Sequence, residues 1–172
     1  GHIDGLVNNA AYNPTPSQSA QVRDWERQLE VSLTGARNCT EAFGEQMVRQ
    51  GTGAMVNIGS DLSSVGPTPT LYTGHTMKPP HYSVVKHGLI GLTRYYAMWW
   101  AKSGVRVNAL CPGPVDFGEL TPCFLDRLRA LIPMGRTADP DEYDGALIFL
   151  LSEASRYMTG SILTVDGGRT CW

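Results

Sequence analysis

The sequence predicts an α/β fold, in which helices cover both faces of a doubly wound parallel sheet. Short apolar runs of strand length alternate along the chain with longer segments of helical periodicity. Such alternation is typical of parallel strands joined by right-handed crossovers. With 172 residues, of which 42% are hydrophobic and 17% charged, the chain is expected to form a single domain over residues 1–172.

The first strand is expected at residues 3–9, a short apolar run that ends in Asn-Asn. An amphipathic helix should follow at about residues 21–49, because apolar side chains recur there every three or four residues. These side chains are Trp25, Leu29, Leu33, Ala36, Phe43 and Met47. Gly51 ends this helix, and a second buried strand is expected at residues 54–58.

Residues 59–80 form the longest irregular stretch, rich in Ser, Gly, Pro and Thr, and we expect this loop to be functional. Pro79 and Pro80 then favour the first turn of a helix over residues 80–102. Its core-facing stripe is predicted to consist of Val85, Leu89, Leu92, Tyr96 and Trp99.

A third strand is expected at residues 105–110, ended by Pro112-Gly113-Pro114. Asp139, Pro140 and Glu142 have the spacing of a capping box at the start of a helix over residues 139–152. The last strand is predicted at Ile162–Val165.

Polar side chains that can carry chemistry follow the second predicted strand, at the edge where ligands bind in open parallel sheets. Ser60 stands directly after that strand, and Tyr82 and Lys86 lie one turn apart on the next helix. A neighbouring cation would lower the pKa of the phenol from about 10 toward neutrality. Ser60 could then hold a substrate oxygen while Tyr82 passes the proton, which indicates carbonyl/alcohol interconversion.

Taken alone, a Tyr-x-x-x-Lys pair is a weak signal, because it occurs by chance on many solvated helices. The sequence contains five motifs in order: N-N-A-A (8–11), V-N-I-G-S (56–60), Y-S-V-V-K-H-G (82–88), V-R-V-N-A-L-C-P-G-P-V (105–115) and M-T-G-S-I-L-T-V-D-G-G (158–168). As a set they resemble the short-chain dehydrogenase/reductase family over residues 3–168. The resemblance implies a Rossmann-type fold, NAD or NADP as cofactor, and hydride transfer at a carbonyl or hydroxyl carbon.

The resemblance also implies roles for individual residues. Tyr82 would be the general acid/base, Lys86 would lower its pKa and hold the nicotinamide ribose, and Ser60 would orient the substrate. The family's fourth catalytic residue, an asparagine, is replaced by Ser32. It is therefore an open question whether this chain has the family's water-mediated proton relay from the lysine. The remaining cofactor contacts would come from Asn8 and Ala10 on the adenosine side, and from Pro112, Gly113 and Val115 on the nicotinamide side.

Two departures from the family pattern concern the class of substrate and whether the Rossmann-type domain is complete. Ser60 and Tyr82 are 22 residues apart, which is longer than is usual for the family and resembles its polyol and nucleotide-sugar branch. The family's opening strand and its Thr-Gly-x-x-x-Gly-x-Gly phosphate turn are missing, and the chain starts with Gly-His rather than Met. We therefore expect an N-terminally incomplete Rossmann-type domain that is inactive in isolation.

Composition excludes several other classes of function. A formal net charge of −2 without a basic run predicts no nucleic-acid partner and no anionic membrane surface. No apolar run approaches the roughly 18 residues of a membrane span, so we expect a cytoplasmic protein. Free thiols are expected at Cys39, Cys111, Cys123 and Cys171.

Alternatives remain for the other notable residues. His75, His81 and His87 cluster in sequence but lack a carboxylate or thiol at ligand spacing, so no metal is predicted. A hydrolase with Ser60 as nucleophile is disfavoured because no Gly-x-Ser-x-Gly elbow surrounds it. For the aromatic group of Tyr95, Tyr96, Trp99 and Trp100 we expect core packing and a homo-oligomer interface. The rival to an enzyme is a non-catalytic relative that oligomerises through its long helices.

Overall fold

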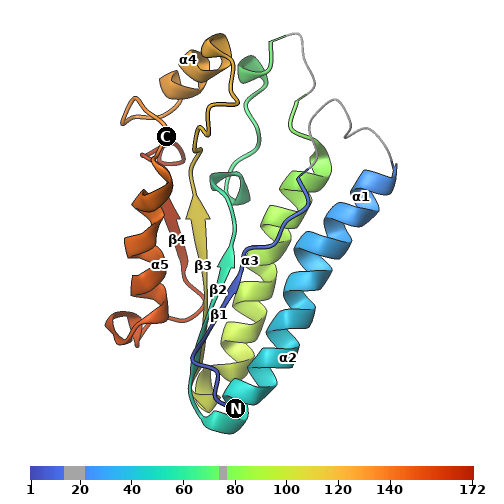
Figure 1. Ribbon diagram of the computed structural model, residues 1–172, viewed down its shortest axis with the longest axis vertical. Helices are drawn as coiled ribbons and strands as arrows, with labels where there is room; N and C mark the ends of the chain where they lie inside the picture. Colours follow the sequence, from blue (N-terminus) through green and yellow to red (C-terminus); the bar gives the residue numbers. More distant parts are fainter. Residues whose placement is uncertain (14–21, 74–76) are drawn as a thin grey trace.

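A four-stranded parallel sheet forms the centre of the computed structural model, which describes residues 1–13, 22–73 and 77–172 (Figure 1). The strands lie side by side in chain order, and each pairs in parallel with the next. They are β1 (Gly5–Asn8), β2 (Gly53–Ile58), β3 (Val105–Pro112) and β4 (Ile162–Val165). The predicted α/β fold is confirmed.

The first helical segment is a single run with an irregular middle. It consists of α1 (Val22–Leu29), a π-helical turn η1 (Glu30–Thr34) and α2 (Gly35–Gln50). The sequence predicted this helix without its π-turn. The other helices are α3 (Pro80–Trp100), α4 (Pro122–Ala130) and α5 (Asp144–Leu151). Gln21, the expected start of the first helix, and His75 of the histidine cluster lie outside the described residues.

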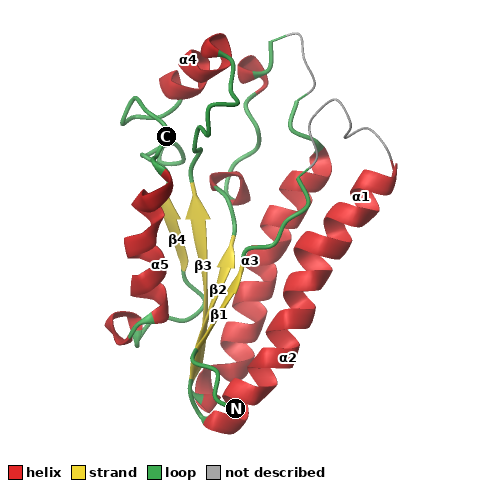
Figure 2. Cartoon of the chain, viewed as in Figure 1, coloured by secondary structure: helices red, strands yellow, loops and turns green. Residues whose placement is uncertain are grey.

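Helices cover both faces of the sheet, as Figure 2 shows. On one face α2 and α3 pack on β2 and β3 through a cluster of Met47, Met55, Tyr96, Ala97, Trp100, Val105 and Val107. On the other face α5 packs through Leu150 against Val56 and Leu110. Because the strands lie in chain order, the β3–β4 crossover through α5 must have the opposite hand to the two crossovers through α2 and α3. The expectation of right-handed crossovers throughout is therefore wrong for at least one of the three.

The core stripe of α3 differs from the prediction at its end. Val85, Leu89 and Tyr96 are buried as expected, but Trp99 is 63% exposed and Trp100 is only 8% exposed. The reason lies on α2, where a Cβ on Gly44 would stand 2.2 Å from the Trp100 ring. Glycine at this position makes the space that the Trp100 indole fills, and Trp99 is left on the surface.

The two outer strands of the sheet are less buried than the two central ones. β1 pairs only with β2 in this sheet, and its Val7 is 37% exposed.

No described helix is long and apolar enough to cross a bilayer. The site considered next lies at the opposite end of the strands from the chain's N-terminus, where β2 and β3 end (Figure 1).

Candidate active site

Ser60, Tyr82 and Lys86 meet where β2 ends and α3 begins. Ser60 follows the last residues of β2, and Tyr82 and Lys86 occupy the first two turns of α3. The Lys86 Nζ lies 5.8 Å from the centroid of the Tyr82 ring and donates a hydrogen bond of 2.9 Å to the Ile58 carbonyl. The fold thus brings together the three residues that the sequence singled out.

Burial dominates the electrostatics of this group. Burial raises the pKa of the Tyr82 phenol and outweighs the Ser60 hydroxyl, which lowers it. Burial also lowers the pKa of Lys86 from 10.5 to about 8. The expected lowering of the Tyr82 pKa by Lys86 is not found, because the ammonium bonds to the Ile58 carbonyl and the phenol is largely desolvated.

Ser60 is held in a fixed orientation by its own turn. It is 6% exposed and caps the 3₁₀ turn η2 (Asp61–Ser63). Its hydroxyl donates to Asp61 Oδ1 at 2.8 Å and accepts from the Leu62 N–H at 3.1 Å. Its backbone N–H donates to Ser63 Oγ at 3.0 Å. The Ser-x-x-Ser spacing in the sequence is the local signal for this cap.

Two charged residues at the site were not predicted from the sequence. Lys78 Nζ lies 4.4 Å from the centroid of the Tyr82 ring, and burial lowers its pKa. Arg169, which follows β4, forms a buried ion pair with Asp61. Lys78 lies only four residues before Tyr82, which is a signal that sequence reasoning could have used. The Arg169 pairing joins residues 108 positions apart and has no local signal.

Ser32 lies in the π-turn η1 and is 2% exposed. Its hydroxyl accepts hydrogen bonds from the Tyr12 backbone N–H at 3.0 Å and from Gln28 Nε2 at 3.4 Å. These contacts tie the helix to the segment that follows β1. They give Ser32 a structural role in the described chain, whereas the hydrogen bond of Lys86 goes to Ile58.

The predicted cofactor residues lie at the carboxyl ends of β1 and β3. Asn8 Nδ2 donates to Thr40 Oγ1 at 2.9 Å and to Asn57 Oδ1 at 2.8 Å, and Ala10 is exposed. Pro112 ends β3, and the Gly113 N–H donates to the Val165 carbonyl at 2.8 Å. A Cβ on Gly113 would stand 2.6 Å from the Asp166 Cα, so the turn requires glycine. Val115 forms an isolated parallel bridge with Ala138.

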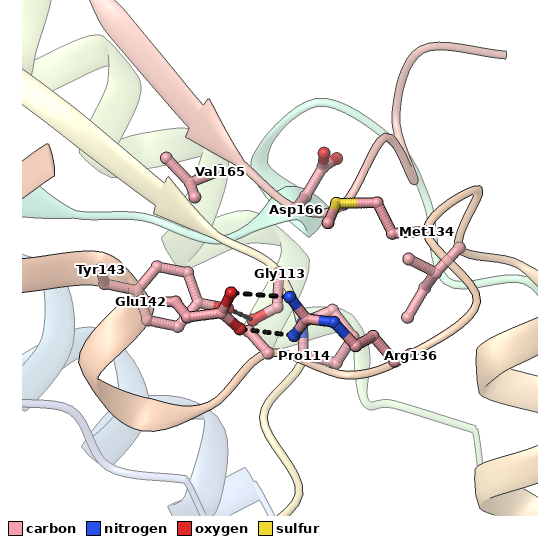
Figure 3. Close-up of a pocket in the computed structure, with 11 residues that line it drawn as sticks. Gly113, Pro114, Met134, Arg136, Glu142, Tyr143, Val165 and Asp166 are labelled. Carbon is pink, nitrogen blue, oxygen red and sulfur yellow. Dashed lines mark hydrogen bonds and ion pairs between the residues drawn. The ribbon is translucent and has the colours of Figure 1, made fainter. Parts of the chain in front are cut away.

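A cavity of about 230 Å³ lies beside this turn and is lined also by Glu142 and Tyr143, which directly precede α5. Figure 3 shows Gly113 and Pro114 on its wall, with the Arg136 guanidinium directed at the Glu142 carboxylate. Tyr82, Lys86 and Ser60 are not among the residues that line it. The cavity therefore does not include the proton-transfer group.

The described histidines do not form a metal centre. His81 packs edge-on against Trp25, with ring centroids 6.2 Å apart, and His87 Nδ1 contacts the Ser83 carbonyl at 2.9 Å. No group of three or more His, Cys, Asp or Glu within metal-binding reach occurs among residues 1–13, 22–73 and 77–172.

Comparison with known proteins defines the family. A model of short-chain dehydrogenases/reductases, described as enoyl-(acyl carrier protein) reductase, matches residues 1–170. The chain belongs to the short-chain dehydrogenase/reductase family. The resemblance carried by the five sequence motifs is thereby confirmed.

Two relatives from this dehydrogenase family are named for galactitol and for a gluconate derivative. Galactitol 2-dehydrogenase of Rhizobium johnstonii is 37% identical over 174 residues, which cover 97% of this chain and 65% of the relative. The 2-dehydro-3-deoxy-D-gluconate 5-dehydrogenase of Bacillus subtilis is 36% identical over 96% of this chain and 64% of the relative. The chain thus spans slightly less than two thirds of the length of these two relatives.

Solved structures agree with the sequence comparison. A gluconate 5-dehydrogenase from Burkholderia cenocepacia, in complex with NADP and tartrate, is similar with a TM-score of 0.87 and 32% identity. The match covers 100% of this chain and 66% of that structure. A short-chain dehydrogenase from Leptospira borgpetersenii with bound NAD⁺ has a TM-score of 0.88 at 29% identity, over 97% of this chain and 65% of that one. The predicted Rossmann-type fold is confirmed.

Proposed function

We propose that this chain is the C-terminal part of an NAD(P)-dependent oxidoreductase that interconverts an alcohol and a carbonyl compound. The observation that carries the proposal is the meeting of Ser60, Tyr82 and Lys86 where β2 ends and α3 begins. Family membership supports the same reaction, because the relatives are named as dehydrogenases.

The residues present fit the nicotinamide half of the cofactor. The Lys86 ammonium has three N–H donors, and its contact with the Ile58 carbonyl engages one of them, which leaves donors for ribose hydroxyls. Pro112, Gly113 and Val115 would flank the nicotinamide at the end of β3. The sequence of this chain contains no Thr-Gly-x-x-x-Gly-x-Gly motif, so the pyrophosphate would be held by other residues of the protein that contains it.

When bound, the nicotinamide would supply the hydride acceptor or donor. In oxidation, Tyr82 takes the proton from the substrate hydroxyl, and in reduction it returns the proton to the carbonyl oxygen. Ser60 orients that oxygen. Lys86 and Lys78 lie 5.8 Å and 4.4 Å from the Tyr82 ring centroid, so two cations stand beside the phenol.

For the substrate we propose a polyhydroxylated compound of the sugar or polyol type, by analogy with the relatives. The test is a panel that includes galactitol and gluconate, with NAD⁺ and NADP⁺, followed by absorbance at 340 nm in the protein that contains this chain. Turnover that requires a nicotinamide cofactor is expected. Absence of cofactor-linked turnover, together with labelling of Ser60 by an activated phosphonate, would favour a hydrolase instead.

We further propose that residues 1–172 alone bind dinucleotide weakly and do not turn over, because the pyrophosphate site is not provided by this chain. Isothermal titration of NADH and NADPH into the purified chain measures this directly. Micromolar binding of either dinucleotide would contradict the proposal.

Association of several copies is proposed from the surface of α3. Tyr95, Met98 and Trp99 are 54%, 83% and 63% exposed, and together they form an apolar patch on one helix. Such a patch fits a homo-oligomer interface, and it equally favours the non-catalytic, oligomerising alternative. The turnover assay separates the two, since that alternative predicts association without activity.

A further inference from the structure

A buried ion pair stands beside the proposed catalytic serine. The Asp61 and Arg169 side chains are 6% and 8% exposed, and the Arg169 guanidinium contacts Asp61 Oδ2. A buried pair of charges is unfavourable unless its remaining polar atoms are also hydrogen-bonded. Here Asp61 Oδ1 accepts from Ser60 Oγ at 2.8 Å and from the Leu62 N–H at 2.7 Å. Both carboxylate oxygens are therefore satisfied.

These contacts fix which way the Ser60 hydroxyl points. A serine hydroxyl has one proton and two lone pairs. In the structure the proton is donated to Asp61, and one lone pair accepts the Leu62 N–H. The second lone pair remains for a further donor. Asp61 thus holds the Ser60 hydroxyl in place beside the Tyr82 phenol.

The same pair contributes to the charge around Tyr82. Lys86 faces the phenol from α3, and Lys78 and Tyr72 face it from the segment between β2 and α3. Asp61 faces it from η2, and Arg169 from the turn after β4. Burial is the largest influence on the pKa of Tyr82 and raises it; the Asp61 carboxylate adds to this rise, and the Arg169 guanidinium opposes it.

We propose that Asp61 and Arg169 are a positioning pair for the reaction, in which Asp61 orients the Ser60 hydroxyl and Arg169 cancels the charge that Asp61 places beside Tyr82. The proposal rests on the function proposed for Ser60 and Tyr82. Asp61 and Arg169 do not touch the reacting atoms. They act through the side chains of Ser60 and Tyr82. A purely structural pair would only hold the turn after β4 against η2. Its two single variants would then not shift the Tyr82 titration in opposite directions.

The test is the titration of Tyr82 in the purified protein, read by ¹⁹F NMR after incorporation of 3-fluorotyrosine. Fluorine lowers the pKa of a phenol and brings the titration into a milder pH range, and Tyr82→Phe identifies the signal. Asp61→Asn should move the titration to lower pH by roughly 1 unit, and Arg169→Met should move it to higher pH by a similar amount. The double variant should lie within about 0.5 unit of the unmutated protein.

The matched control is Arg37→Met, which removes an exposed arginine of the Arg37–Glu41 pair on α2 and should leave the Tyr82 titration unchanged. Where Arg169→Met does not fold, Asp61→Asn is compared with Asp61→Asn/Arg169→Gln, and the second variant must titrate at higher pH. Shifts of the same sign in both single variants, or no shift, would overturn the proposal. Because the titration needs no turnover, its outcome is independent of whether the proposed reaction is correct.

Discussion

Replacement of Lys86 by methionine should remove the proposed function and increase stability. Burial lowers the pKa of Lys86 from 10.5 to about 8 in the folded protein. At 1.36 kcal/mol per pKa unit, holding this lysine charged at pH 7 costs roughly 3 kcal/mol of folding free energy. The variant also loses the hydrogen bond from Nζ to the Ile58 carbonyl, worth about 1 kcal/mol. The expected net gain at pH 7 is therefore about 2 kcal/mol.

The pH dependence identifies the cause of this gain. Between pH 8 and 10.5 the unfolded chain binds more protons at Lys86 than the folded chain does, so the stability of the unmutated protein rises with pH in that window. The advantage of Lys86→Met should shrink accordingly, vanish at about pH 10, where the remaining cost of burying the charge equals the lost hydrogen bond of about 1 kcal/mol, and reverse above that pH. Urea unfolding at pH 7, 8.5 and 10 measures both quantities. A variant that is less stable at pH 7, or a difference that does not change with pH, would refute the reasoning.

Two further predictions concern packing and assembly. Gly44→Ala should destabilise the fold by about 2 kcal/mol, because the new Cβ would overlap the Trp100 ring. The control is Gly91→Ala on α3, where a Cβ meets nothing within 4 Å, and this change should be neutral or slightly stabilising. The denaturant midpoints of the two variants measure the difference. Trp99→Ser should weaken self-association about tenfold or more without loss of helix content, as measured by sedimentation and circular dichroism. An unchanged midpoint in Gly44→Ala, or unchanged association in Trp99→Ser, would contradict these two accounts.

The elements with a strong local pattern could be predicted from the sequence. The strand at Ile162–Val165 and the start of α3 at Pro80 agree with the structure, and the Asp139–Glu142 capping box is present. The helix α4 was not predicted, although Thr121 followed by Pro122 is a usable start signal and the Thr121 side chain does cap the helix.

Features that depend on distant contacts could not be predicted. Trp99 and Trp100 fit a core stripe almost equally well, and the choice between them depends on Gly44, a residue of a different helix. The hand of the last crossover depends on which face of the sheet α5 covers, and the sequence of α5 is apolar all round. In the candidate site, Ser60, Tyr82 and Lys86 follow from spacing along strand and helix, but the Asp61–Arg169 pair depends on how β4 returns to the sheet.

The most direct test of the central claim is the Tyr82→Phe variant in the protein that contains this chain. Phenylalanine keeps the ring but removes the hydroxyl that moves the proton, so the turnover number should fall by roughly a thousandfold or more. The affinity for NAD(P)H, followed by fluorescence titration, should stay within about threefold, because this change leaves Lys86 and the Gly113 turn in place. Turnover near that of the unmutated enzyme would contradict the assignment of Tyr82 as the proton-transfer residue.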